Sequence, residues 1–83
     1  MLRNMDRVDL WQRLAARPRN ARFAEIDQLL RLAGWELHHV RGSHHVYVDG
    51  RRKHFSLPRD RGNVKVAYVR LVLGMTQEDP RDD

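Results

Sequence analysis

The sequence predicts an α+β fold in which helices cover one face of a three-stranded antiparallel sheet. Two observations predict it. Apolar residues recur at helical spacing before Gly34 and again after Asn63, and the segment between them is rich in β-branched and aromatic residues separated by turn signals. The expected order is helix, helix, strand, strand, strand, helix. Domains usually contain about 50 to 250 residues, so the 83 residues are expected to form a single domain, 1–83, with a thin core.

Two helices are expected before Gly34. The first covers residues 5–16, where apolar side chains repeat on one face and Asn4 or Asp6 stands at a capping position. Pro18 ends this helix, because a proline disfavours the helical conformation of the residue before it. Asn20 is expected to cap the second helix, and Gly34 suits the left-handed conformation that often follows a helix.

Three short strands are expected between residues 35 and 57. Gly42 marks the turn between the first and second strands, and Asp49-Gly50 is typical of a two-residue hairpin turn between the second and third. Pro58 ends the third strand because proline has no N–H to donate to a sheet.

A last helix is expected over residues 64–75, where apolar residues return at helical spacing. The valine-rich stretch 64–73 also suits a strand, so that alternative stays open from the sequence alone. Residues 76–83 are polar and acidic, and a flexible tail is expected there.

The charge of the chain favours a polyanionic partner. Sixteen Lys and Arg against eleven Asp and Glu give a net charge of +5, and residues 41–70 hold eight of these basic residues against two acidic ones. The absence of cysteine excludes a disulfide framework, a thiolate nucleophile and a thiolate zinc site. No apolar run approaches the roughly 20 residues of a membrane span, and no signal-peptide pattern is visible, so a cytoplasmic protein without a membrane partner is expected.

The segment Gly42-Ser43-His44-His45 has the most chemical content. Adjacent residues of a strand point to opposite faces, so one of the two histidines should face solvent and the other the helices. A histidine has an ordinary pKa of about 6.5, so it can act as a general base or acid on an RNA 2′-hydroxyl near neutral pH. Both can equally be ordinary strand-end histidines. Their spacing to the other histidines matches no known ligand pattern, so neither a metal nor another cofactor is expected.

Five features follow one another within an expected core of 20–75: a helix ending in Ala33-Gly34-Trp35, the Gly42-Ser43-His44-His45 strand opening, the Gly50 hairpin, a strand ending in Leu57-Pro58, and the closing helix. In this combination, residues 22–75 resemble the HicA family of toxin endoribonucleases.

The resemblance implies a double-stranded-RNA-binding-domain-like α-β-β-β-α fold and an mRNA interferase that needs one histidine and no metal. It also implies inhibition by a HicB-type antitoxin protein. The family's histidine falls on His44, with His45 as the alternative. Many members carry a second histidine where this chain has Asp60, so any role of that histidine is absent here or filled elsewhere. The helix over residues 5–16 is an addition that either completes the core or forms a homodimer through Leu10, Trp11 and Leu14.

The remaining site residues follow from the same hypothesis. Ser43 is expected to position the histidine or to bind phosphate, and four cations are expected to hold RNA phosphates: Arg41, Arg52, Lys53 and Lys65. The alternative function is a noncatalytic module that binds double-stranded RNA through the same basic surface and needs no histidine chemistry.

Overall fold

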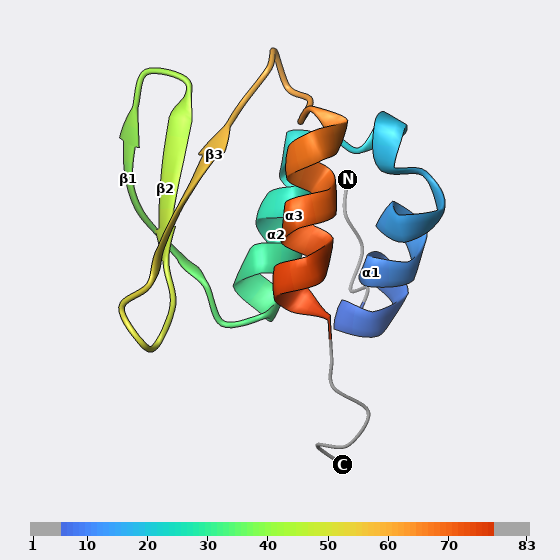
Figure 1. Cartoon of the computed structure of the whole chain (residues 1–83), viewed down its shortest axis with the longest axis horizontal. Coiled ribbons are helices and arrows are strands. Elements are labelled where there is room, and N and C mark those ends of the chain that lie inside the picture. The colour runs from blue at the N-terminus through green and yellow to red at the C-terminus, as the bar shows by residue number, and fades with distance from the viewer. Residues whose placement is uncertain (1–5, 78–83) are drawn as a thin grey trace.

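The computed structural model, which describes residues 6–77, has the expected order of elements (Figure 1). The helices and strands are α1 (Arg7–Ala16), a 3-10 turn η1 (Pro18–Asn20), α2 (Phe23–Leu32), β1 (Glu36–Arg41), β2 (His44–Val48), β3 (His54–Pro58) and α3 (Val66–Thr76). The strands form one antiparallel sheet in the order β1-β2-β3. The predicted α+β class with three antiparallel strands is therefore confirmed. In the described residues, no helix is both long and apolar enough to cross a membrane.

The elements form three layers. Figure 1 shows the sheet on one side, α2 and α3 next to it, and α1 on the far side of these two helices. Leu10 and Leu14 of α1 are buried against α2 and α3, and the indole Nε1 of Trp11 donates a hydrogen bond of 2.8 Å to the carbonyl of Leu73. Of the two roles expected for the added helix, the structure therefore supports completion of the core.

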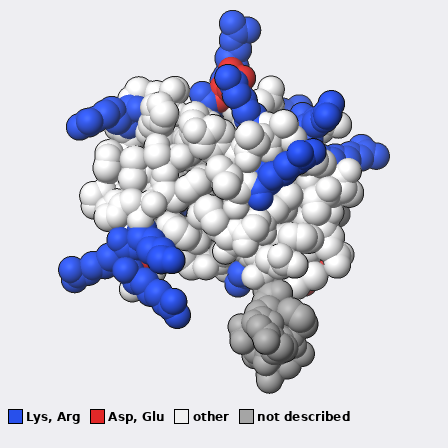
Figure 2. Space-filling model, in the orientation of Figure 1, with Lys and Arg blue, Asp and Glu red and all other residues white. Residues whose placement is uncertain are grey.

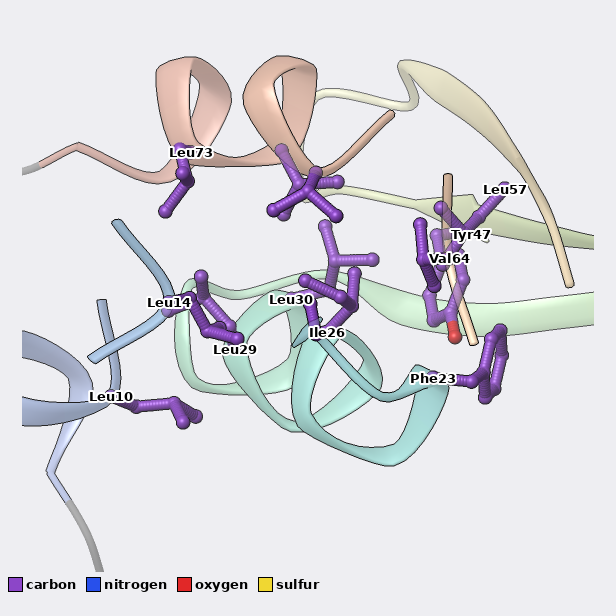
Figure 3. Close-up of a cluster of buried hydrophobic side chains, with 13 residues drawn as sticks. Leu10, Leu14, Phe23, Ile26, Leu29, Leu30, Tyr47, Leu57, Val64 and Leu73 are labelled. Carbon is purple, nitrogen blue, oxygen red and sulfur yellow. The ribbon is translucent and has the colours of Figure 1, made fainter. Parts of the chain in front are cut away.

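The core extends from the sheet between α2 and α3 to α1 (Figure 3). In α2 the buried residues Ile26, Leu29 and Leu30 recur at a spacing of three and four, which places them on one face of the helix. Tyr47 and Leu57 reach this core from β2 and β3, and α3 contributes Val69, Val72 and Leu73.

A polar contact fixes how the sheet sits on α2. The hydroxyl of Tyr47 donates a hydrogen bond of 2.6 Å to the carboxylate of Asp27, which also pairs with the guanidinium of Arg31 at 2.9 Å. Burial, followed by this hydrogen bond, raises the pKa of Tyr47 well above its ordinary value. A one-residue slip of β2 would turn Tyr47 away from Asp27, so the contact favours a single register.

The expected N-cap of the second helix is wrong by two residues. Asn20 ends the 3-10 turn η1, and α2 begins at Phe23 with Arg22 at its N-cap. The backbone N–H of Arg22 donates to the carboxylate of Glu25 at 3.0 Å, and the N–H of Phe23 donates to the carbonyl of Gly62 at 2.8 Å. Partners from Glu25 and from a distant loop thus satisfy this helix end, so the cap at Asn20 is not needed.

The Asp49-Gly50 turn is also longer than predicted. Three residues lie between Asp49 and Lys53, whose backbone groups are joined by a hydrogen bond of 3.1 Å. The carboxylate of Asp49 accepts hydrogen bonds from the N–H groups of Arg51 and Lys53, at 2.9 and 2.8 Å. Arg52 takes the left-handed conformation, with φ of 64°. The side chain of Asp49 therefore stabilises a wider turn than its pairing with Gly50 predicts.

The last segment is a helix, so the strand alternative for residues 64–73 is wrong. Val64 is buried but precedes the helix, and Thr76, predicted to open the tail, lies buried within α3. At the other end, α1 begins at Arg7 and Asp6 caps it by accepting a hydrogen bond of 2.9 Å from the N–H of Asp9. The first residue of the predicted helix, Met5, and the tail residues 78–83 lie outside the described residues.

Candidate nucleic-acid interface

The two faces of β2 differ in what they contact. The ring of His45 lies 4.4 Å from that of Phe23, centroid to centroid, and Tyr47 bonds Asp27, so both point toward the helices. Alternation then places His44, Val46 and Val48 on the opposite side. This side, which carries no helix in Figure 1, is called the open face here. The prediction that the two histidines face opposite ways agrees with this arrangement.

His44 stands on the open face with a polar neighbour on each side. Its Nδ1 lies 3.2 Å from the hydroxyl oxygen of Ser56 on β3, and Arg41 pairs with it directly across β1. All three residues are exposed. A serine hydroxyl can both donate and accept, so this contact suits a neutral ring in either tautomer and a protonated ring. The contact uses Nδ1 and leaves Nε2 for a substrate.

His45 occupies a packing position. Its ring lies against Phe23, and the guanidinium carbon of Arg59 lies 5.0 Å from the centroid of that phenyl ring. Its Nδ1 is buried and has no hydrogen-bond partner among the described residues. RNA that lies on the open face would meet His44 and not His45, so the geometry favours His44 of the two predicted candidates.

Two of the other predicted residues lie at the same end of the sheet as His44. Ser43 is in the β1–β2 turn, and its carbonyl accepts a hydrogen bond of 2.8 Å from the N–H of Arg59, which follows β3. Lys65 is the N-cap of α3, which begins at the same upper end of the molecule in Figure 1. Arg41 and Lys65 thus place positive charge at this end of the molecule.

Arg52 and Lys53 are not brought to His44. They belong to the β2–β3 turn, and β2 runs from His44 to Val48 between the two ends, a separation of about 13 Å at the usual rise of a strand. Figure 2 shows one group of Lys and Arg side chains at the lower left, where Figure 1 places this turn, and others around the upper edge. The predicted basic surface is therefore divided between two ends of the sheet.

The open face also carries residues that the sequence did not single out as a group. His39 and Ser56 flank Val46 across the sheet, and His54 pairs with Val48. His38 joins them because the register of β1 shifts at this point: its Nδ1 lies 2.7 Å from that of His39, and its ring centroid lies 6.0 Å from that of His54. The alternation of residues 54–57 already implied Ser56 and His54, whereas no sequence signal marks the irregularity at His38.

The arrangement of His44 and Arg41 is suited to acid–base chemistry beside an anion. An exposed imidazole next to a guanidinium can exchange a proton with a hydroxyl while the cation neutralises a phosphate oxygen. Within residues 6–77, no group of three or more His, Cys, Asp or Glu side chains is placed to hold a metal ion.

Comparison of the sequence with models of known protein families gives no match, and searches of curated proteins and of solved structures give none either.

Proposed function

We propose that this chain is a toxin endoribonuclease of the HicA type, which cleaves mRNA in the cytoplasm without a metal and is neutralised by a HicB-type antitoxin. The observation that carries the proposal is His44, exposed on the open face between Arg41 and Ser56. The order α2-β1-β2-β3-α3 supports the finer proposal that residues 20–75 form a double-stranded-RNA-binding-domain-like core.

The proposed reaction is attack of an RNA 2′-oxygen on its own 3′-phosphorus. The bond between the 2′-oxygen and phosphorus forms, and the bond from phosphorus to the 5′-oxygen of the next nucleotide breaks, leaving a 2′,3′-cyclic phosphate and a 5′-hydroxyl. As a neutral imidazole, His44 takes the 2′-hydroxyl proton on Nε2 while water protonates the leaving 5′-oxygen. As an imidazolium, it instead protonates the leaving 5′-oxygen while water takes the 2′-hydroxyl proton. Arg41 stabilises the negative charge that develops on the phosphate.

The test is incubation of purified protein with a labelled structured RNA in EDTA. We expect cleavage that leaves 2′,3′-cyclic phosphate ends, its loss in His44→Ala, and its retention in His45→Ala that circular dichroism shows to be folded. His39→Ala is the matched control, because it removes another exposed histidine of the same face. Activity that survives in His44→Ala but not in folded His45→Ala would move the role to His45.

The noncatalytic alternative predicts a different result. RNA that stays intact with all variants, while binding weakens steeply as salt is added, would replace the enzyme with a double-stranded-RNA-binding module. The two groups of cations at the ends of the sheet would serve either function, so only the histidine variants separate them.

A further inference from the structure

A cavity of about 700 Å³ lies at the end of the sheet away from His44. It is open to solvent on one side, and its wall is formed by the chain that leaves α2, the β2–β3 turn and the end of α3, around Gly34, Asp49 and Met75. Its volume is within the range of roughly 300 to 1,000 Å³ that small-molecule sites occupy. The function proposed above does not use it.

Two aromatic residues line this cavity. Trp35 and Phe55 are both half-buried, and their rings meet edge to face, with centroids 6.4 Å apart and planes at 68°. Their packing against the core leaves part of each ring on the cavity wall. Aromatic surface of this kind stacks nucleobases whatever their sequence, since every base has a flat π-face.

Cations line the same cavity beside the aromatic rings. Arg51, Lys53 and His54 are exposed residues of its wall. Among residues 6–77, the one acidic residue of the wall is Asp49, and its carboxylate accepts hydrogen bonds from backbone N–H groups of the turn. Among the described residues, no carboxylate forms an ion pair with Arg51 or Lys53, so these side chains remain available to a phosphate.

We propose that this cavity binds one unpaired nucleobase of an RNA strand, stacked on Trp35 and Phe55, with an adjoining phosphate on Arg51 and Lys53. The inference rests on the proposed function for its substrate, because His54 belongs both to the open face and to the cavity wall. A strand that follows the open face from His44 reaches His54 after about 13 Å. It must then turn around the β2–β3 end of the sheet to reach the rings, because Phe55 pairs with Tyr47 and therefore faces the helices. An acidic peptide would use the cations but would leave the aromatic wall uncovered, so an unpaired nucleotide fits the site better.

The consequence for the substrate is a preference for RNA that is single-stranded on one side of the cut. A base that is paired in a helix cannot enter the cavity, whereas an unstacked base of a loop or an end can. The cavity would therefore hold a base at a fixed short distance from the phosphate at His44.

Fluorescence tests the proposal without cleavage. The chain has two tryptophans, and Trp11 is not among the residues that line the cavity, so Trp11→Phe leaves Trp35 as the reporter. The probe is a short single-stranded RNA of 2′-O-methyl nucleotides, in which the 2′-oxygen cannot attack. We expect the probe to quench Trp35 emission, and one abasic position to remove the quenching and to weaken binding roughly 5- to 150-fold.

Variants extend this test to the protein side. Phe55→Ala should weaken binding of the intact probe by a similar factor and make it indifferent to the abasic position. Lys53→Gln should lower the slope of log affinity against log salt by about 0.7, the effect of one phosphate contact on a single strand. The abasic probes need no change in the protein, so they decide the question even where Phe55→Ala does not fold.

Several results would overturn the proposal. Equal binding and quenching by the abasic probes would show that no base enters the cavity. If, in addition, an oligoaspartate peptide displaces the probe from Trp35, the cavity would be a peptide site. This test and the cleavage assay give separate answers. Cleavage by a protein whose binding does not depend on the base would support the nuclease and contradict the cavity site. Base-dependent quenching without cleavage would support the cavity site and contradict the nuclease.

Discussion

At the scale of single residues, the contact between His44 and Ser56 sets how the imidazole is held. We predict that Ser56→Ala slows RNA cleavage by roughly 2- to 12-fold, because the variant loses one ordinary hydrogen bond to the ring but keeps the ring itself. His44→Ala should abolish cleavage. The split between kcat and KM is the deciding measurement, since the loss should fall on kcat with KM unchanged, and Ser56→Thr, which keeps a hydroxyl, should restore the rate. An unchanged kcat in Ser56→Ala would contradict the positioning role.

Tyr47 links the stability of the protein to alkaline pH. Burial and the hydrogen bond to Asp27 raise its pKa above the ordinary value of about 10. The unfolded chain ionises this phenol near pH 10, whereas the folded chain holds it protonated. The contribution of Tyr47 to the free energy of unfolding is therefore fully present below about pH 10 and is lost as the pH rises above it.

Tyr47→Phe tests this linkage. We predict that the variant loses about 1.5 to 3 kcal/mol of stability at pH 7, the usual contribution of a hydrogen bond to a charged group, and that its stability falls less steeply than that of the wild type above pH 10. Urea denaturation at pH 7 to 11 measures both effects. Tyr68→Phe removes the other tyrosine hydroxyl of the chain and serves as the control. Parallel curves for wild type and Tyr47→Phe above pH 10 would refute the linkage.

At the scale of elements, the β2–β3 turn holds Arg52 in a conformation that favours glycine. Its φ of 64° is left-handed, and this conformation crowds the Cβ of any residue other than glycine. We predict that Arg52→Gly stabilises the protein by about 0.5 to 1 kcal/mol, whereas Arg51→Gly, at a position without positive φ, destabilises it by a similar amount. Urea midpoints measure both. A shift of both variants in the same direction would contradict the strain at Arg52.

The elements show how far local sequence signals reach. The helices and strands, the glycine turn at Gly42 and the opposite faces of His44 and His45 follow from periodicity and turn chemistry, which act over a few residues. The start of α2 does not, because a carbonyl in the distant β3–α3 loop, that of Gly62, binds its first N–H. Likewise, the turn after β2 is wider than predicted because the carboxylate of Asp49 accepts a hydrogen bond from the N–H of Lys53. No local signal in the sequence marks the shift of register at His38.

At the scale of the whole molecule, the candidate site depends on how the sheet is mounted on the helices. Sequence reasoning gathered the cations into one surface because it counted charge along the chain. The length of β2 separates Lys53 from Arg41, and this distance exists only in the folded sheet. The split gives the molecule two basic ends joined by the open face, and under the proposed function one RNA strand would contact both.

The added helix α1 is part of this fold and not an accessory to it. Leu10 is fully buried among the residues of α2 and α3, so Leu10→Ala removes three heavy atoms from a packed core. We predict a loss of about 2 to 5 kcal/mol, against a total stability of about 5 to 15 kcal/mol for a domain of ordinary size. Deletion of residues 1–17 should therefore leave the chain unfolded. Val8→Ala is the matched control, because Val8 is 43% exposed on the same helix and should change stability by no more than about 0.5 kcal/mol.

Urea denaturation followed by circular dichroism measures these losses, and the protein concentration separates the two roles first considered for the helix. If α1 completes the core of one chain, the midpoint of each variant stays the same as the protein is diluted. If it instead forms a dimer, the midpoint falls on dilution, because dissociation then precedes unfolding. A truncated chain, lacking residues 1–17, that keeps the native spectrum and a wild-type midpoint would show that α2, α3 and the sheet fold alone, and that Leu10 and Leu14 are not required by the core.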